Sequence, residues 1–169
     1  MAQIRLWTVI GPANSGKTST IGALVSQSKG AGGARDILLR GGGWIRIFAY
    51  RQSVQEAGKT PEDEAKRINL IVSKIKRVRP SYVNFLLALR SDSFQGLPQG
   101  DAYLNHFVTL GWRIESIVLL GKDMEHPSFN HYADFGAPIA EMLKSGDWLK
   151  NDLERNWVFG QARNHFGWA

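Results

Sequence analysis

The chain of 169 residues contains no cysteine, so it has no disulfides, no thiolate nucleophile and no cysteine-ligated zinc. It also lacks a long hydrophobic run. The longest uncharged apolar stretch, residues 82–89, is far shorter than the roughly 20 residues of a membrane helix. The first residues lead directly into a strand-like segment, so no signal peptide is expected. From these absences we expect a cytoplasmic protein that does not enter a membrane.

The charge balance is modestly basic, with 21 Lys and Arg against 15 Asp and Glu, which gives a net charge of +6. A basic excess favours anionic partners such as nucleotides, phosphorylated metabolites or nucleic acid. An ordinary basic surface is the alternative, because a charge of this size is common in soluble domains. The length and the absence of internal repeats predict one domain over residues 1–169.

Hydrophobic periodicity predicts alternating strands and helices. Strands rich in β-branched and aromatic residues are expected over residues 4–10, 44–50, 82–89 and 114–120. Helices are expected over residues 18–27, 61–79, 101–111 and 147–166. This alternation predicts an α/β fold, a three-layer sandwich around a mainly parallel sheet, in which ligands bind at the carboxyl ends of the strands. The tryptophans of the predicted strands, Trp7 and Trp44, are expected in the core.

The segment after the first predicted strand carries a phosphate-binding motif. Every fixed position of G-x-x-x-x-G-K-[ST] is matched by Gly11-Pro12-Ala13-Asn14-Ser15-Gly16-Lys17-Thr18. The glycines let the backbone curl so that successive N–H groups point at one phosphate, and the following helix adds its positive N-terminus. Lys17 is suited to reach the β- and γ-phosphates, and the Thr18 hydroxyl is suited to ligate Mg²⁺.

The motif, placed between a strand and a helix, resembles that of the P-loop NTPase superfamily. The resemblance implies a P-loop NTPase-like fold that binds ATP or another nucleoside triphosphate together with Mg²⁺. It implies phosphate contacts from residues 11–18 and from the adjacent Ser19, with Lys17 as a catalytic residue and Thr18 as a metal ligand.

One feature departs from that superfamily. Its members usually end a neighbouring buried strand with an acidic residue that holds the magnesium shell, whereas here residues 82–89 are followed by Arg90, Ser91 and Asp92. Asp92 is the first candidate for the metal-side acid, with Glu56 and Asp123 as reserves. The GTPase signature D-x-x-G and the guanine-reading motif [NT]-K-x-D are missing from their expected places, which favours adenine nucleotides.

Cationic residues follow three predicted strands, namely Arg51, Arg90 and Lys122. In a parallel sheet they emerge near the phosphate loop, where arginine is suited to bidentate phosphate contact. Arg51 and Arg90 are therefore candidate catalytic residues that hold a transition state or a second anionic substrate. The alternative is that these cations pair with nearby acids in surface networks.

Three functions follow from these features, with a Mg²⁺-dependent ATPase first. The second is a phosphotransferase, in which Arg51 and Arg90 clamp an anionic acceptor. Residues 30–43, which include six glycines, are predicted to be a flexible loop. In this second function the loop, which carries Arg35 and Arg40, closes over the site as a lid that excludes water. The third is a non-catalytic switch, in which nucleotide orders that loop and controls a protein partner.

The predicted helix over residues 61–79 also carries a basic surface. Its cations, on or just past the helix, are Lys66, Arg67, Lys74, Lys76, Arg77 and Arg79. No nucleic-acid recognition motif accompanies them, so we expect at most weak, nonspecific binding through phosphates.

Overall fold

The computed structural model describes residues 2–26, 33–75, 81–120 and 152–169, and the side chains of residues 152–157 are outside the description. The described strands are β1 (Gln3–Gly11), β2 (Ala34–Leu38), β3 (Trp44–Ser53), β4 (Tyr82–Arg90) and β5 (Arg113–Leu119). The described helices are α1 (Lys17–Val25), α2 (Pro61–Lys74), α3 (Gly100–Thr109) and α4 (Asp152–His165).

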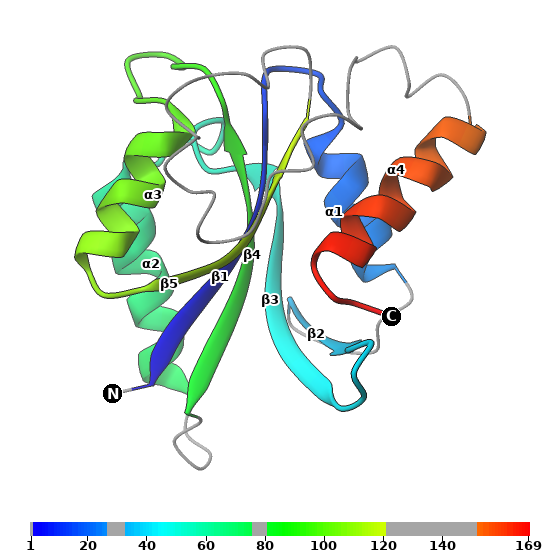
Figure 1. Cartoon of the computed structure of the whole chain (residues 1–169). Helices are drawn as coiled ribbons and strands as arrows, with labels where there is room; N and C mark the ends of the chain where they lie inside the picture. The colour runs from blue at the N-terminus through cyan, green and yellow to red at the C-terminus, as the bar shows by residue number, and fades with distance from the viewer. Residues whose placement is uncertain (1, 27–32, 76–80, 121–151) are drawn as a thin grey trace.

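The strands form one sheet in the order β2-β3-β4-β1-β5. The pairs β3–β4, β4–β1 and β1–β5 are parallel, and only the edge strand β2 runs antiparallel to its neighbour β3. Helices α2 and α3 cover one face of the sheet, and α1 and α4 cover the other (Figure 1). The predicted α/β class with a mainly parallel sheet is confirmed, and the helices lie on both faces, as a three-layer arrangement requires.

The core lies on both faces of the two central strands, β1 and β4. Leu6 and Ile10 of β1 belong to the hydrophobic cluster beneath α2 and α3, whereas Trp7 and Val9 belong to the cluster beneath α1 and α4. Strand β4 is buried from its second residue to its last, as expected of a parallel strand that is covered on both sides. The carboxyl ends of β1 and β4 are therefore held in fixed relative positions, and both meet the phosphate loop.

Helix α2 begins where the sequence predicts. The Thr60 side chain accepts a hydrogen bond from the Asp63 backbone N–H at 3.2 Å, and Pro61 is the first helical residue. The helix ends at Lys74, and residues 76–80 at the predicted helix end lie outside the described residues. Among the described residues, no helix is both long and apolar enough to cross a membrane.

The prediction of a flexible loop over residues 30–43 is wrong for its second half. Residues 34–38 form β2, which pairs with β3, and residues 27–32 lie outside the description. The glycines that follow serve a tight turn: Gly42 and Gly43 adopt φ of 84° and 85°, and the Leu39 N–H donates to the Gly43 carbonyl at 3.0 Å. Glycine at this position therefore permits a hairpin, and the described residues form no lid.

The expectation that Trp44 lies in the core is also wrong. Trp7 is buried, but Trp44 is 65% exposed because it begins β3 directly after the turn of the β2–β3 hairpin. Strand composition predicts the strand but does not show which of its residues the helices cover.

Candidate functional site

The phosphate-loop motif connects the end of β1 to the start of α1. The loop turns back on itself through two residues with positive φ, Asn14 at 58° and Gly16 at 90°. Gly11 is required by space, because a Cβ there would lie 2.4 Å from the Ser15 Oγ and 2.6 Å from the Leu120 carbonyl oxygen. The loop therefore curls tightly around its own centre, with the N-terminus of the nine-residue helix α1 beside it.

Lys17 is the first residue of α1 and is 5% exposed. Its ammonium group donates a hydrogen bond to the Pro12 carbonyl at 2.6 Å, across the loop. Burial lowers the pKa of Lys17, and the neighbouring carboxylate of Glu56 opposes that shift. A cation is thus held inside the loop with one neutral oxygen as its hydrogen-bond partner.

A pocket of about 270 Å³ opens over this loop and is lined by residues 14–19 together with Glu56. Thr18 points its hydroxyl at the end of β3 and donates to the Arg51 carbonyl at 3.2 Å. The Ser15 hydroxyl is buried without a hydrogen-bond partner among the described residues. An orphaned hydroxyl, a buried lysine and a helix N-terminus are groups that fit a phosphate.

Beside the loop, the end of β4 presents Arg90 where an acid is usual in the superfamily that the motif resembles. The Arg90 guanidinium binds both carboxylate oxygens of Asp92, at 3.1 and 2.6 Å, and stacks 4.4 Å from the centre of the Phe94 ring. Chiefly through this hydrogen bonding, Arg90 lowers the pKa of Asp92. The described residues that line the pocket do not include Asp92.

Gln55 joins the ends of β3 and β4 and is completely buried. Its amide accepts from the Arg90 backbone N–H at 3.0 Å and donates to the Arg90 carbonyl at 3.2 Å. Where β3 leaves its pairing with β4, the Gln55 side chain thus makes the hydrogen bonds to the β4 backbone that a neighbouring strand would otherwise make. Sequence reasoning misses Gln55, because its role depends on how the two parallel strands end beside each other.

The structure brings most of the predicted site residues together. Lys17, Arg90, Asp92 and Glu56 lie within electrostatic reach of one another. Arg51 does not join them through its guanidinium, which lies beside α1: a Cβ on Gly22 would be 3.6 Å from its Cζ. Arg90 pairs with the acids Asp92 and Glu56, which is the alternative role predicted for the cations that follow the strands. Lys122 and Asp123 lie outside the described residues.

The described residues offer few ligands for a metal ion. In the described part of the chain, no group of three or more His, Asp or Glu residues could hold a metal ion. Mg²⁺ needs no such group, because it is commonly bound by one or two protein oxygens together with substrate phosphates and water. The Thr18 hydroxyl and a single carboxylate would therefore suffice if a polyphosphate supplied further oxygens.

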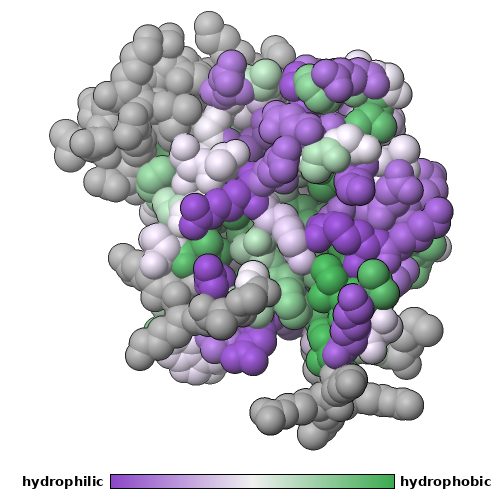
Figure 2. Space-filling view, turned by 180° about the vertical axis from the view of Figure 1, so that it is seen from behind, coloured by the Kyte–Doolittle hydropathy of each residue, from purple (hydrophilic) through white to green (hydrophobic). Residues whose placement is uncertain are grey.

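The predicted basic surface on α2 is only partly described. Lys66 and Lys74 are exposed, whereas Arg67 is ion-paired with Glu64 and lies 3.8 Å from the centre of the Tyr50 ring. Hydrophilic residues predominate on the right-hand side of Figure 2, where α2 lies. The remaining predicted cations, Lys76, Arg77 and Arg79, lie outside the described residues.

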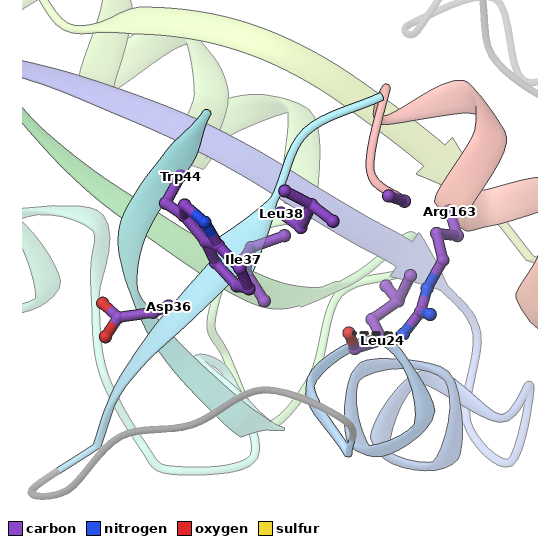
Figure 3. Close-up of a pocket in the computed structure, with 7 residues that line it drawn as sticks. Leu24, Asp36, Ile37, Leu38, Trp44 and Arg163 are labelled. Carbon is purple, nitrogen blue, oxygen red and sulfur yellow. Dashed lines mark hydrogen bonds between the residues drawn. The ribbon is translucent and has the colours of Figure 1, made fainter. Parts of the chain in front are cut away.

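A second pocket, of about 240 Å³, lies on the side of α1 and β2 near the C-terminus (Figure 3). Its lining mixes apolar and charged side chains and comprises Leu24, Asp36, Ile37, Leu38, Trp44, Arg163 and Ala169. The Asp36 carboxylate binds Arg46 at 2.7 and 2.9 Å, and Arg163 donates to the Leu24 carbonyl at 3.2 Å. Both charged side chains of this pocket are therefore engaged within the fold.

The two arginines of the predicted lid also lie away from the phosphate loop. Arg35 is part of β2, and Arg40 donates to the Trp168 carbonyl at 3.3 Å in the C-terminal segment. The hairpin that carries them is at the lower right of Figure 1, whereas the loop between β1 and α1 is at the top.

Comparison of the chain with protein-family models, with curated protein sequences and with solved structures finds no match.

Proposed function

We propose that the chain is a Mg²⁺-dependent nucleoside triphosphatase that binds ATP through residues 11–18. The observation that carries the proposal is Lys17, a buried cation inside a curled loop at a helix N-terminus, with one carbonyl as its hydrogen-bond partner. Burying a charge is costly unless a partner compensates it. A polyphosphate would provide that compensation, because it replaces one neutral oxygen with charged ones.

The residues of the pocket have distinct parts in this proposal. Backbone N–H groups of the loop and the α1 N-terminus bind phosphate oxygens, and Lys17 exchanges the Pro12 carbonyl for the β- and γ-phosphates. Thr18 exchanges the Arg51 carbonyl for the metal. Bound Mg²⁺ would neutralise the charge that develops on the phosphate oxygens.

The phosphotransferase and switch alternatives gain no support from the described residues. The phosphotransferase requires residues 30–43 to close as a lid, and the switch requires nucleotide to order the same residues. Residues 34–43 instead form β2 and its turn, and Arg40 is bound to the C-terminal segment. An ATPase needs no such lid, so it is the proposal that requires no structural element beyond those described.

A ligand series measured by calorimetry tests the proposal. Affinity should rise from AMP to ADP to ATP, and inorganic tripolyphosphate should compete, because the loop binds phosphates. Lys17→Ala should weaken ATP binding by about 100-fold, the loss of one or two charge-assisted contacts. Lys66→Ala, an exposed lysine on α2, is the matched control and should bind normally. Equal ATP affinity in the Lys17→Ala protein and the wild type would refute the proposal.

A further inference from the structure

Two acids flank Arg90, and they differ in how they are engaged. Asp92 gives both carboxylate oxygens to the guanidinium, at 3.1 and 2.6 Å, in a bidentate pair. Glu56 has one oxygen 3.9 Å from the nearest Arg90 nitrogen, too far for a hydrogen bond. The carboxylate of Asp92 is therefore committed to the arginine, whereas that of Glu56 is not.

Glu56 is also the acid that faces the pocket. It lines the same cavity as Lys17 and Thr18. Its backbone N–H donates to the Ser53 hydroxyl at 3.2 Å, which fixes the turn after β3, and the neighbouring Gln55 ties that turn to the end of β4. Thr18 is anchored to the same strand end through the Arg51 carbonyl. The hydroxyl and the carboxylate thus line one pocket beside the end of β3.

We infer that Glu56, and not Asp92, supplies the carboxylate on the magnesium side of the bound triphosphate. In this arrangement Asp92 is a positioning residue that neutralises Arg90 and holds its guanidinium beyond hydrogen-bond distance of Glu56. The inference rests on the proposed function. Mg²⁺ prefers oxygen ligands and commonly binds through one or two carboxylates plus phosphates, which Glu56, Thr18 and a triphosphate would provide.

The charge of Glu56 gives the inference a distinctive signature. Without Mg²⁺, its carboxylate faces the phosphates and repels them. With Mg²⁺ present, the same carboxylate would attract the cation that accompanies the phosphates. Removing that charge should therefore change ATP affinity in opposite directions under the two conditions, a pattern that simple damage to the fold does not produce.

The test measures ATP affinity in Mg²⁺ and in EDTA for the wild type, Glu56→Gln, Asp92→Asn and Glu62→Gln. Glu56→Gln should weaken binding by about tenfold in Mg²⁺, the usual scale for loss of a group that supports a metal, and strengthen it in EDTA. Asp92→Asn releases the Arg90 guanidinium to engage Glu56, 3.9 Å away, so it should shift the two affinities in the same senses as Glu56→Gln but by less. Glu62, an exposed acid on α2, controls for the substitution itself.

The outcomes separate the two claims. If wild-type protein and all variants fail to bind ATP, the proposed function fails and the inference fails with it. If the wild type binds ATP with a clear Mg²⁺ preference that Asp92→Asn abolishes and Glu56→Gln retains, the proposed function stands and the inference is overturned. Parallel weakening by Glu56→Gln in Mg²⁺ and in EDTA would also overturn the inference, because it would indicate a structural role.

Discussion

The pocket over the phosphate loop and the pocket beside β2 are similar in volume, about 270 and 240 Å³, but their charged side chains are used differently. Beside β2, Asp36 and Arg163 are both bound to partners within the fold. Over the loop, Lys17 is buried with one neutral carbonyl as hydrogen-bond partner, and Glu56 stands 3.9 Å from the nearest cationic nitrogen.

In the proposed function, this difference separates side chains that stabilise the fold from side chains that would bind a ligand. Arg163 donates to the carbonyls of Ala23 and Leu24 in the last turn of α1, which is a usual role of a cation at a helix C-terminus. Lys17 is at the opposite end of the same helix, where the helix dipole opposes a positive charge. Its position there is unfavourable for the fold alone and favourable once an anion is bound.

The largest expected effect is on the packing of the loop. Gly11→Ala should destabilise the protein by about 1–3 kcal/mol, the usual cost of overpacking, because the added Cβ meets the Ser15 Oγ and the Leu120 carbonyl. Gly41→Ala in the β2–β3 turn is the matched control, since no heavy atom lies within 4 Å of its added Cβ. Urea unfolding of both variants measures the contrast, and equal stabilities would show that the loop is looser than described.

Arg163→Met should lower stability by about 1–2 kcal/mol. It removes hydrogen bonds from a charged donor to the Ala23 and Leu24 carbonyls while retaining most of the side-chain volume. ATP affinity should remain unchanged, because this side chain serves the other end of α1. A loss of ATP affinity without a loss of stability would contradict the separation between the two regions.

Lys17→Met should have the opposite profile, with stability unchanged or slightly raised and ATP binding weakened by about 100-fold, as for Lys17→Ala. The substitution removes a buried cation whose pKa is lowered by desolvation, and the half-buried Pro12 carbonyl loses a single donor. Thermal unfolding and calorimetry on the same sample provide both values. A large loss of stability would mean that Lys17 supports the fold in the same way as Arg163.

A smaller effect is expected from His165 in α4, whose ring N–H donates to the Ile117 carbonyl at 3.1 Å. Burial lowers the pKa of His165 below 6.5, so the unfolded chain binds the proton more readily than the folded protein. Stability should therefore fall as the pH drops below 6.5 and level off beneath the folded-state pKa. His165→Gln should flatten this part of the melting-temperature profile; an unchanged profile would assign the dependence to other groups.

The curled loop of residues 11–18 can be predicted from the sequence because its residues are contiguous and its geometry is local. The other side of the pocket cannot, because Gln55 and Glu56 reach Arg90 only through the parallel pairing of β3 with β4. For the same reason, the sequence does not show which of the three candidate acids, Glu56, Asp92 or Asp123, lies at the pocket. Strand β2 is missed because its five residues are stabilised by pairing with β3, and a glycine-rich context favours a loop when read locally.

The most direct test of the account is hydrogen exchange with and without Mg²⁺ and ATP. Amides in residues 13–20 and 53–56 should exchange more slowly when the nucleotide is bound, because the first group binds phosphates and the second carries Glu56. Amides in residues 34–44 and 163–169, around the second pocket, should be unaffected. Protection confined to the β2–β3 hairpin, or no protection in the loop at saturating ATP, would contradict the assignment of the phosphate loop as the nucleotide site.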